Sequence, residues 1–150
     1  MIVNDLIQIV LITLTPLLES RASIPYGILV LDVHWIFVFL VAALSNIFLA
    51  YMTYTFLDKF IEFTIRFKIL KTFYTKHALK VQNKIKTYVE KYGEFGVAVF
   101  IGIPIPGSGV CSAALGSHVL GMGINKFMKA AIAGVLISAT IITSITVIFL

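Results

Sequence analysis

The stretch FGVAVFIGIPIPGSGVCSAALGSHVLGMG, residues 95–123, decides how this chain folds. It contains no Asp, Glu, Lys or Arg and is long enough to cross a bilayer, yet its centre is interrupted by Pro104, Pro106, Gly107 and Gly109. Proline removes a backbone donor and clashes with the preceding turn, and glycine loosens the backbone. We therefore expect two half-helices, over 95–103 and 110–121, which rise about 14 and 18 Å and reach roughly the bilayer midplane.

The composition of the whole chain indicates an integral membrane protein. Of its 150 residues, 59% are hydrophobic and 13% are charged, whereas about a quarter of a typical soluble domain is charged. Residues 35–57 and 130–150 are long and apolar enough to form full transmembrane helices. The N-terminus has neither a basic start nor an Ala-x-Ala cleavage pattern. We therefore expect no removable signal peptide.

The first apolar stretch, residues 6–31, is interrupted in the same way as residues 95–123. All four prolines of the chain fall in these two stretches, and the first contains Pro16 and Pro25. We predict that each stretch forms a helical hairpin rather than one continuous helix.

The distribution of charge predicts how the chain lies in the membrane. The net charge is −2 over residues 1–57, +5 over 58–94 and +2 over 95–150. The positive-inside rule therefore places the central segment in the cytoplasm. If the second hairpin crossed the membrane, Lys126 and Lys129 would lie outside, so we expect it to be re-entrant. We expect the same of the first hairpin, although it is long enough to cross.

Together these features predict an all-α integral membrane protein with a single membrane domain, residues 1–150. Two inverted halves, 1–57 and 95–150, would each be a re-entrant helical hairpin followed by a transmembrane helix, and 58–94 would join them. Many transporters have this inverted-repeat plan, with binding sites near the midplane where broken helices meet. We also expect a homodimer, because two spans and two hairpins offer little protein to shield polar tips from lipid.

The linker carries a basic amphipathic pattern. Apolar side chains share one helical face, and another face is shared by Lys76, Lys80, Lys84 and Lys91. We predict a helix on the cytoplasmic leaflet, where each lysine near anionic lipid contributes about 1 kcal/mol. Nucleic-acid-binding and calmodulin-binding segments can have the same pattern, but tethering between two membrane halves favours membrane lipids as the partner, with no nucleic acid.

Two charged residues lie inside the first hairpin, in TPLLESRASIPYG, residues 15–27. A charge at the bilayer centre costs about 2.5 to 3.5 kcal/mol, so such residues are usually paired and functional. Positions i and i+2 of a helix point apart, so Glu19 and Arg21 meet only if the backbone is unwound, as Pro16 and Pro25 would allow. We expect either a substrate and proton site or an ion pair that holds the hairpin in place.

The sequence PIPGSG, residues 104–109, predicts a site for an anion. The backbone N–H groups expected to be free there belong to Gly107, Ser108, Gly109 and Val110. They can converge at the N-terminus of the next half-helix, where a phosphate or carboxylate is favoured. The alternative, a tight turn that reverses the hairpin, is compatible with this role. The stretch does not match a Walker A loop, which needs Lys and Ser or Thr after the last glycine.

Other polar and small residues have several interpretations. His118 is either a proton relay or, as lone histidines more often are, a packed side chain. Asn46 lies in the middle of a span and is expected to hydrogen-bond across helices. A stripe of small residues for close helix packing, expected within the chain rather than between copies, consists of Ala130, Gly134 and Ser138.

The chain offers little for catalysis. A single cysteine, Cys111, excludes an intrachain disulfide and is expected to pack as a small apolar residue. The sequence contains no Ser-His-Asp set, carboxylate pair or metal-ligand spacing. We therefore expect no enzyme activity, no metal and no cofactor.

Two motifs resemble those of a known family. Glu-x-Arg-x-x-Ile-Pro-x-Gly, residues 19–27, is followed at a distance by Pro-x-Pro-Gly-Ser-Gly, residues 104–109. Together they are similar to the small multidrug export proteins, bacterial and archaeal membrane proteins related to the DedA superfamily. The resemblance covers most of the chain and implies two re-entrant hairpins, each followed by membrane helices. It also implies the movement of lipid-linked phosphates or phospholipids, with proton coupling, as proposed for DedA relatives.

The chain departs from the DedA pattern in one respect. That pattern implies essential arginines in the second half, and residues 95–150 contain none. The cation that pairs with a substrate anion would then be Arg21, or Lys126 at the cytoplasmic mouth.

We predict a multi-pass cell-membrane transporter or flippase that moves an anionic or lipid-linked phosphate substrate and exchanges protons. The predicted site consists of Glu19, Arg21, Pro25, Pro104, Pro106, Gly107, Ser108, Gly109 and Val110. Secondary candidates are Asn46, His118 and Lys126. One alternative is an exporter of small cationic or amphipathic drugs, with Glu19 as its site. Another is a non-transporting membrane organiser that binds anionic lipid through the basic linker.

Overall fold

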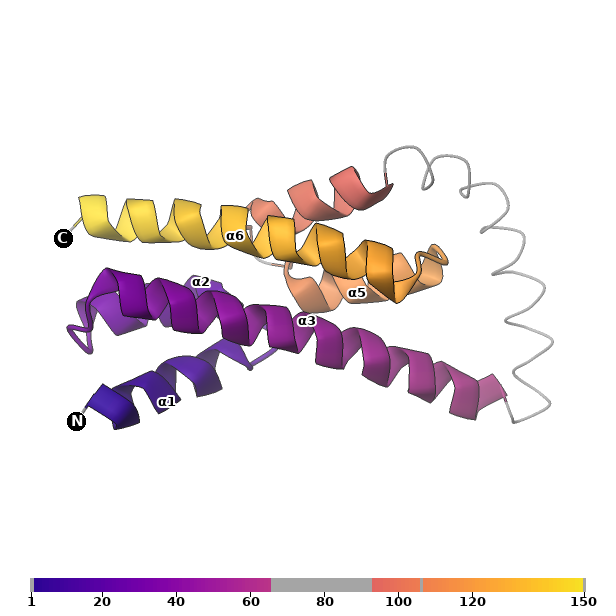
Figure 1. The fold of residues 1–150 in the computed structure, drawn as a ribbon, viewed down its shortest axis with the longest axis horizontal. Helices are drawn as coiled ribbons and strands as arrows, with labels where there is room; N and C mark the ends of the chain where they lie inside the picture. The colour runs from indigo at the N-terminus through magenta and orange to yellow at the C-terminus, as the bar shows by residue number, and fades with distance from the viewer. Residues whose placement is uncertain (1, 66–92, 106, 150) are drawn as a thin grey trace.

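The chain folds into helices, and its two halves have the same order of short and long helices. The computed structural model describes residues 2–65, 93–105 and 107–149, and within these ranges there are helices and no strands. In each half of the chain, a pair of short helices precedes a long one (Figure 1). The helices are α1 (Ile2–Thr13), α2 (Glu19–Leu29), α3 (Trp35–Ile65), an unlabelled helix (Gly93–Gly102), α5 (Val110–Val119) and α6 (Ile124–Ile148). The predicted all-α class is confirmed.

Some predicted features lie outside the described residues. These are the amphipathic linker helix with Lys76, Lys80, Lys84 and Lys91, and the residue Pro106.

Both proline-containing stretches are broken into two helices. Residues 14–18, which include Pro16, separate α1 from α2, and residues 103–109 separate the Gly93–Gly102 helix from α5. The predicted breaks are thus present where proline removes backbone donors. Pro25 differs, because it lies inside α2 and the helix continues through it. The expectation that Pro25 helps to unwind the backbone was wrong, since a helix can lose one i to i−4 hydrogen bond and still continue.

The two long helices contain the predicted spans. The segments Trp35–Phe60 and Ile124–Ile148 are long and apolar enough to cross a membrane. α6 begins at Ile124 rather than at the expected Ala130, directly after Gly123, whose backbone is extended. The apolar stretch starts only after the last charged residue, Lys129, but the helix starts earlier. Exposed lysines such as Lys126 are good helix formers and do not end a helix.

The long helices set the frame of the molecule. α3 and α6 pack against each other and run in opposite directions (Figure 1). α2 packs on both of them, and α5 packs mainly on α3. The turn between α1 and α2 and the turn at residues 103–109 both lie near the middle of the long helices (Figure 1). The two turns are therefore brought to one place in the fold.

The stripe of small residues on α6 lets another helix come close. Ala130, Gly134 and Ser138 are all buried. A Cβ atom added at Gly134 would lie 2.7 Å from the carbonyl oxygen of Ala98 and 2.7 Å from the Cβ of Ile101. Such distances are shorter than real Cβ atoms allow. Glycine at position 134 therefore lets the Gly93–Gly102 helix pack this closely on α6. The stripe packs within the chain, as expected.

Candidate functional site

The site is built around the turn at residues 103–109. Gly107 has a φ of +91°, a left-handed conformation that favours glycine. The Ser108 amide donates to the Ile105 carbonyl at 3.1 Å, and the Ser108 hydroxyl lies 2.6 and 2.9 Å from the carbonyl oxygens of Ile103 and Ile105. Hydrogen bonds within the turn thus stabilise it. The turn ends at Gly109, the N-cap of α5.

Glu19 reaches this turn from the other half of the chain. Its side chain is 4% exposed. Its Oε2 accepts a hydrogen bond from the Val110 amide at 3.1 Å, and its Oε1 accepts one from the Cys111 amide at 3.4 Å. These are the first two N–H groups of α5, which have no partner inside the helix and lie at its positive end. A carboxylate therefore caps α5 from 91 residues away.

Gly109 makes room for this carboxylate. A Cβ atom built on Gly109 would overlap with both carboxylate oxygens and with Cδ of Glu19. The predicted glycine-rich anion site is thus occupied by an anion that belongs to the chain itself. Of the four amides expected to be free, Val110 donates to Glu19 and Ser108 donates within the turn. Cys111, which was not in the predicted set, supplies the second amide to Glu19.

The backbone of Glu19 itself is unusual. Its φ is +50°, a left-handed conformation that is uncommon for residues other than glycine. Such a conformation costs about 1 to 2 kcal/mol. It occurs at the first residue of α2, directly after the break at residues 14–18. The contacts of the carboxylate with the α5 amides help to offset this cost.

Arg21 reaches the same turn and binds neutral groups. Its guanidinium donates through Nη1 to the Ile105 carbonyl and through Nη2 to the Ser108 hydroxyl, the latter at 2.9 Å. Among the residues that the structure describes, no carboxylate lies within ion-pair distance of Arg21. Glu19 and Arg21 thus make no ion pair with each other and instead contact the second hairpin separately. The i and i+2 spacing, which points side chains apart, allows this arrangement.

Buried polar side chains support the first hairpin. Asn46 of α3 donates from Nδ2 to the Ser20 hydroxyl at 3.0 Å. Thr13 of α1 bonds to the Ser23 hydroxyl of α2 at 2.7 Å. The expectation that Asn46 bonds across helices is confirmed. Its Oδ1 is buried and has no hydrogen-bond partner within the described ranges.

The remaining predicted residues lie at various distances from this cluster. Pro104 is in the turn and Pro25 is in α2. His118 lies at the far end of α5, where its Nε2 is 3.3 Å from Asp58 Oδ1 of α3. Lys126 is exposed in the first turn of α6 and has no contact with Glu19 or Arg21 in the described part of the chain. No group of residues suited to hold a metal occurs in 2–65, 93–105 and 107–149.

The contact of the first turn of α5 with α3 can be tested by forming a disulfide. Thr53 Oγ1 lies 3.5 Å from Cys111 Sγ. We expect Thr53→Cys to form a disulfide with Cys111 on mild oxidation, because the side chains at these two positions are already in contact and a disulfide requires such close side chains. The measurement is a free-thiol count by mass spectrometry under denaturing conditions. Met52→Cys, on an exposed position next to Thr53, should keep both thiols free; equal oxidation of the two variants would contradict the packing.

The fold and the site together define a class of protein. The chain is all-helical within its described ranges, has two apolar helices of membrane length, and brings two hairpin turns together around a buried carboxylate and a guanidinium. Apolar helices of this length around a buried polar site are typical of α-helical membrane proteins. Residues 19–141 match a family described as "Putative small multi-drug export protein", and the chain belongs to that family.

The family points to a membrane location and to a transporter, a class that is not enzymatic. No curated protein and no solved structure has significant similarity to the chain.

Proposed function

We propose that this protein moves an anionic substrate, such as a lipid-linked phosphate, through the site between the two hairpin turns and exchanges protons at Glu19. The family description supports export as the general activity. The relationship to the DedA superfamily stays a prediction, as does the homodimer.

One observation carries the choice of an anionic substrate. The Arg21 guanidinium binds only the Ile105 carbonyl and the Ser108 hydroxyl among the described residues. Within the described residues it makes no ion pair, and the charge of Glu19 acts on it only through space. Arginine holds phosphate through two parallel N–H donors, and neutral acceptors are weaker partners that a phosphate can replace.

Glu19 supplies the means of exchange. Its carboxylate occupies the α5 amides that would otherwise bind a phosphate. When Glu19 takes up a proton it loses its charge, so its bonds to the amides weaken and the amides become free for the substrate anion. When Glu19 loses the proton, the carboxylate competes with the substrate and favours release. Substrate and Glu19 thus bind the α5 amides in turn.

The arrangement of the helices supports access from two sides. α1 and α2 have 12 and 11 residues, so each rises about 17 Å, roughly half of a hydrocarbon core of about 30 Å. Two such hairpins, followed by antiparallel long helices, fit the inverted-repeat plan with a site at the midplane. On this proposal both hairpins are re-entrant, and the segment 58–94 lies in the cytoplasm.

Reconstitution into vesicles tests the proposal. Wild type and Glu19→Gln are compared for movement of labelled polyprenyl phosphate, phospholipid and a cationic dye across a pH gradient. We expect wild type to move the polyprenyl phosphate with a dependence on the gradient, and Glu19→Gln to fall to the rate of empty vesicles.

Two other outcomes would contradict the proposal. Transport of the dye alone, lost in Glu19→Gln but unaffected in Arg21→Ala, would indicate an exporter of cations. If no probe moves, while loss of Lys76, Lys80 and Lys84 abolishes binding to anionic vesicles, a membrane organiser is indicated.

A further inference from the structure

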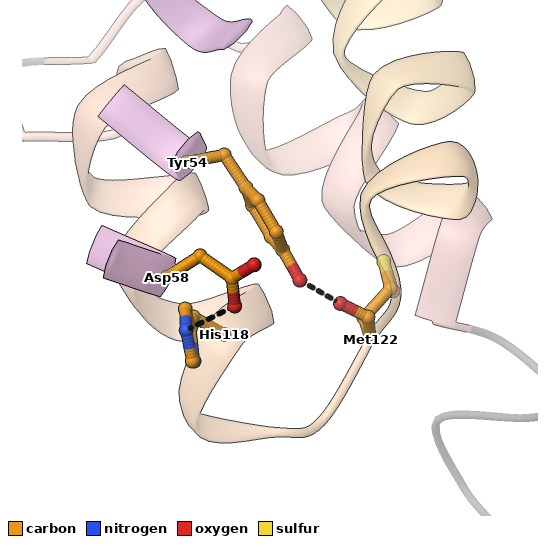
Figure 2. Close-up of polar contacts among 4 residues, drawn as sticks. All are labelled: Tyr54, Asp58, His118 and Met122. Carbon is orange, nitrogen blue, oxygen red and sulfur yellow. Dashed lines mark hydrogen bonds and ion pairs between the residues drawn. The ribbon is translucent and has the colours of Figure 1, made fainter. Parts of the chain in front are cut away.

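A second cluster of titratable groups lies at the opposite end of α5 from Glu19. Figure 2 shows His118 of α5 beside Asp58 of α3, with Nε2 3.3 Å from Oδ1. The ring of Tyr54 stacks on His118 at a centroid distance of 5.5 Å and on Phe127 at 4.9 Å. The Tyr54 hydroxyl donates to the carbonyl of Met122 (Figure 2). The imidazole thus contacts Asp58 and Tyr54 of α3, and Tyr54 is itself positioned by Phe127 of α6 and by the Met122 carbonyl.

The cluster connects solvent with the interior. The Asp58 side chain is 63% exposed, whereas that of His118 is 15% exposed. Both ring nitrogens of His118 are buried, and neither makes a hydrogen bond of normal geometry to a described residue. The contact of Nε2 with Asp58 is therefore its route to the surface.

The two long helices that pack on α5 carry charged or titratable side chains near this end of the molecule. α3 contributes Asp58 and Tyr54. α6, which also packs on α5, carries the exposed residues Lys126 and Lys129 in its first two turns. Asp58 is the charged group in contact with the His118 ring, at the end of the molecule from which the chain leaves α3 for segment 66–92.

One face of α5 joins this cluster to Glu19. Cys111 and His118 are seven residues apart, so they lie on the same helical face about 10 Å apart along the axis. The Cys111 amide donates to Glu19, and its Sγ lies 3.5 Å from Thr53 of α3. α3 and α5 run in the same direction (Figure 1), so the Thr53 and Asp58 contacts follow one seam between them. Beside His118, the Ser117 hydroxyl is buried without a hydrogen-bond partner within the described ranges, which is the kind of group that bound water satisfies.

From this geometry we infer that His118 and Asp58 form the proton-exchange site through which Glu19 communicates with solvent at the end of the molecule where α3 meets segment 66–92. The inference rests on the proposed function, because it assumes that Glu19 is protonated and deprotonated. His118 takes up one proton from water at a ring nitrogen and becomes imidazolium beside the Asp58 carboxylate. It then releases that proton through water along the α3–α5 seam to the Glu19 carboxylate, and the reverse order discharges Glu19.

The rate of Glu19 protonation tests the inference. The full chain is placed in lipid nanodiscs and exposed to a rapid drop in pH, and the carboxylic acid C=O band is followed by time-resolved infrared spectroscopy. The band is assigned to Glu19 by its loss in Glu19→Gln. We expect His118→Ala and Asp58→Asn to slow the appearance of the band by at least about tenfold without changing its final amplitude, because general acid–base groups commonly contribute this much or more.

Two comparisons separate proton exchange from a structural effect. His34→Gln changes an exposed histidine outside α5, in the connection between α2 and α3, and should leave the rate unchanged. Added imidazole should restore the rate of Glu19 protonation in His118→Ala. It would not restore the rate if the substitution had only destabilised the protein.

Unchanged rates in both His118→Ala and Asp58→Asn, or no recovery with imidazole, would overturn the inference. The Glu19 band itself would still support the proton step of the proposed function. If wild type has no Glu19 band at any pH between about 4 and 9, a range set by the spread of perturbed carboxyl pKa values, the proton step of the proposed function fails as well.

Discussion

Gly109→Ala is expected to expel the Glu19 carboxylate from the N-terminus of α5 and to lower the free energy of unfolding by about 3 kcal/mol or more. The added Cβ atom would overlap with the carboxylate, and Glu19 would lose its hydrogen bonds to the Val110 and Cys111 amides. A hydrogen bond to a charged group contributes about 1.5 to 3 kcal/mol, and a buried charge left without partners is more costly still. Unfolding of the purified protein in detergent, followed by temperature or denaturant, measures the change.

Other substitutions provide controls for this one. Gly116 lies inside α5, and a Cβ atom added there would have no neighbouring atom within 4 Å, so Gly116→Ala should be neutral or stabilise by up to about 1 kcal/mol. In a Glu19→Ala background, Gly109→Ala should cost much less, because the carboxylate it displaces is already absent. Equal losses from Gly109→Ala with and without Glu19 would contradict the assigned contact.

Arg21→Ala is expected to reduce transport of labelled polyprenyl phosphate by about 100-fold, equivalent to roughly 2.7 kcal/mol of lost interaction. The guanidinium is a charged donor that contacts the turn, and its removal also leaves the Ile105 carbonyl and the Ser108 hydroxyl without this partner. Arg21→Lys should retain only part of the activity, because an ammonium cannot form the same two parallel hydrogen bonds. The measurement is the initial rate in reconstituted vesicles.

Lys129→Ala is the matched control for the loss of a positive charge. Lys129 is exposed on α6 and contacts neither Glu19 nor Arg21 in the described part of the chain. Its removal should leave the initial rate unchanged. Equal rates for wild type and Arg21→Ala would mean that the guanidinium does not bind the substrate.

The helix breaks could be predicted because they depend on local chemistry. Pro16, and the prolines and glycines of residues 103–109, remove donors or loosen the backbone wherever they occur. Pro25 shows the limit of that rule, since packing of α2 on α3 and α6 keeps the helix intact through it. The predicted start of α6 is also too late, because the edge of an apolar stretch is not the end of a helix.

The partners in the site could not be predicted in the same way. The sequence indicated that Glu19, Arg21 and the PIPGSG stretch belong to one site, but it left open how they meet. The contact between Glu19 and Val110 spans 91 residues, and the left-handed backbone at Glu19 has no local signal in the sequence. What decides both is the packing of α2 against the second hairpin. Asp58, which lies beside His118, was missed because a charge near the end of a span usually marks only the membrane surface.

The central claim is that Glu19 and a substrate anion compete for the α5 amides. Calorimetric titration of the purified protein with a short-chain polyprenyl phosphate tests it most directly, with the uncharged polyprenol as control. Glu19→Gln should bind the phosphate at least about tenfold more tightly than wild type at neutral pH, a gain of about 1.4 kcal/mol, even though its transport is lost. Equal or weaker binding by Glu19→Gln, or equal binding of the polyprenol, would contradict the claim.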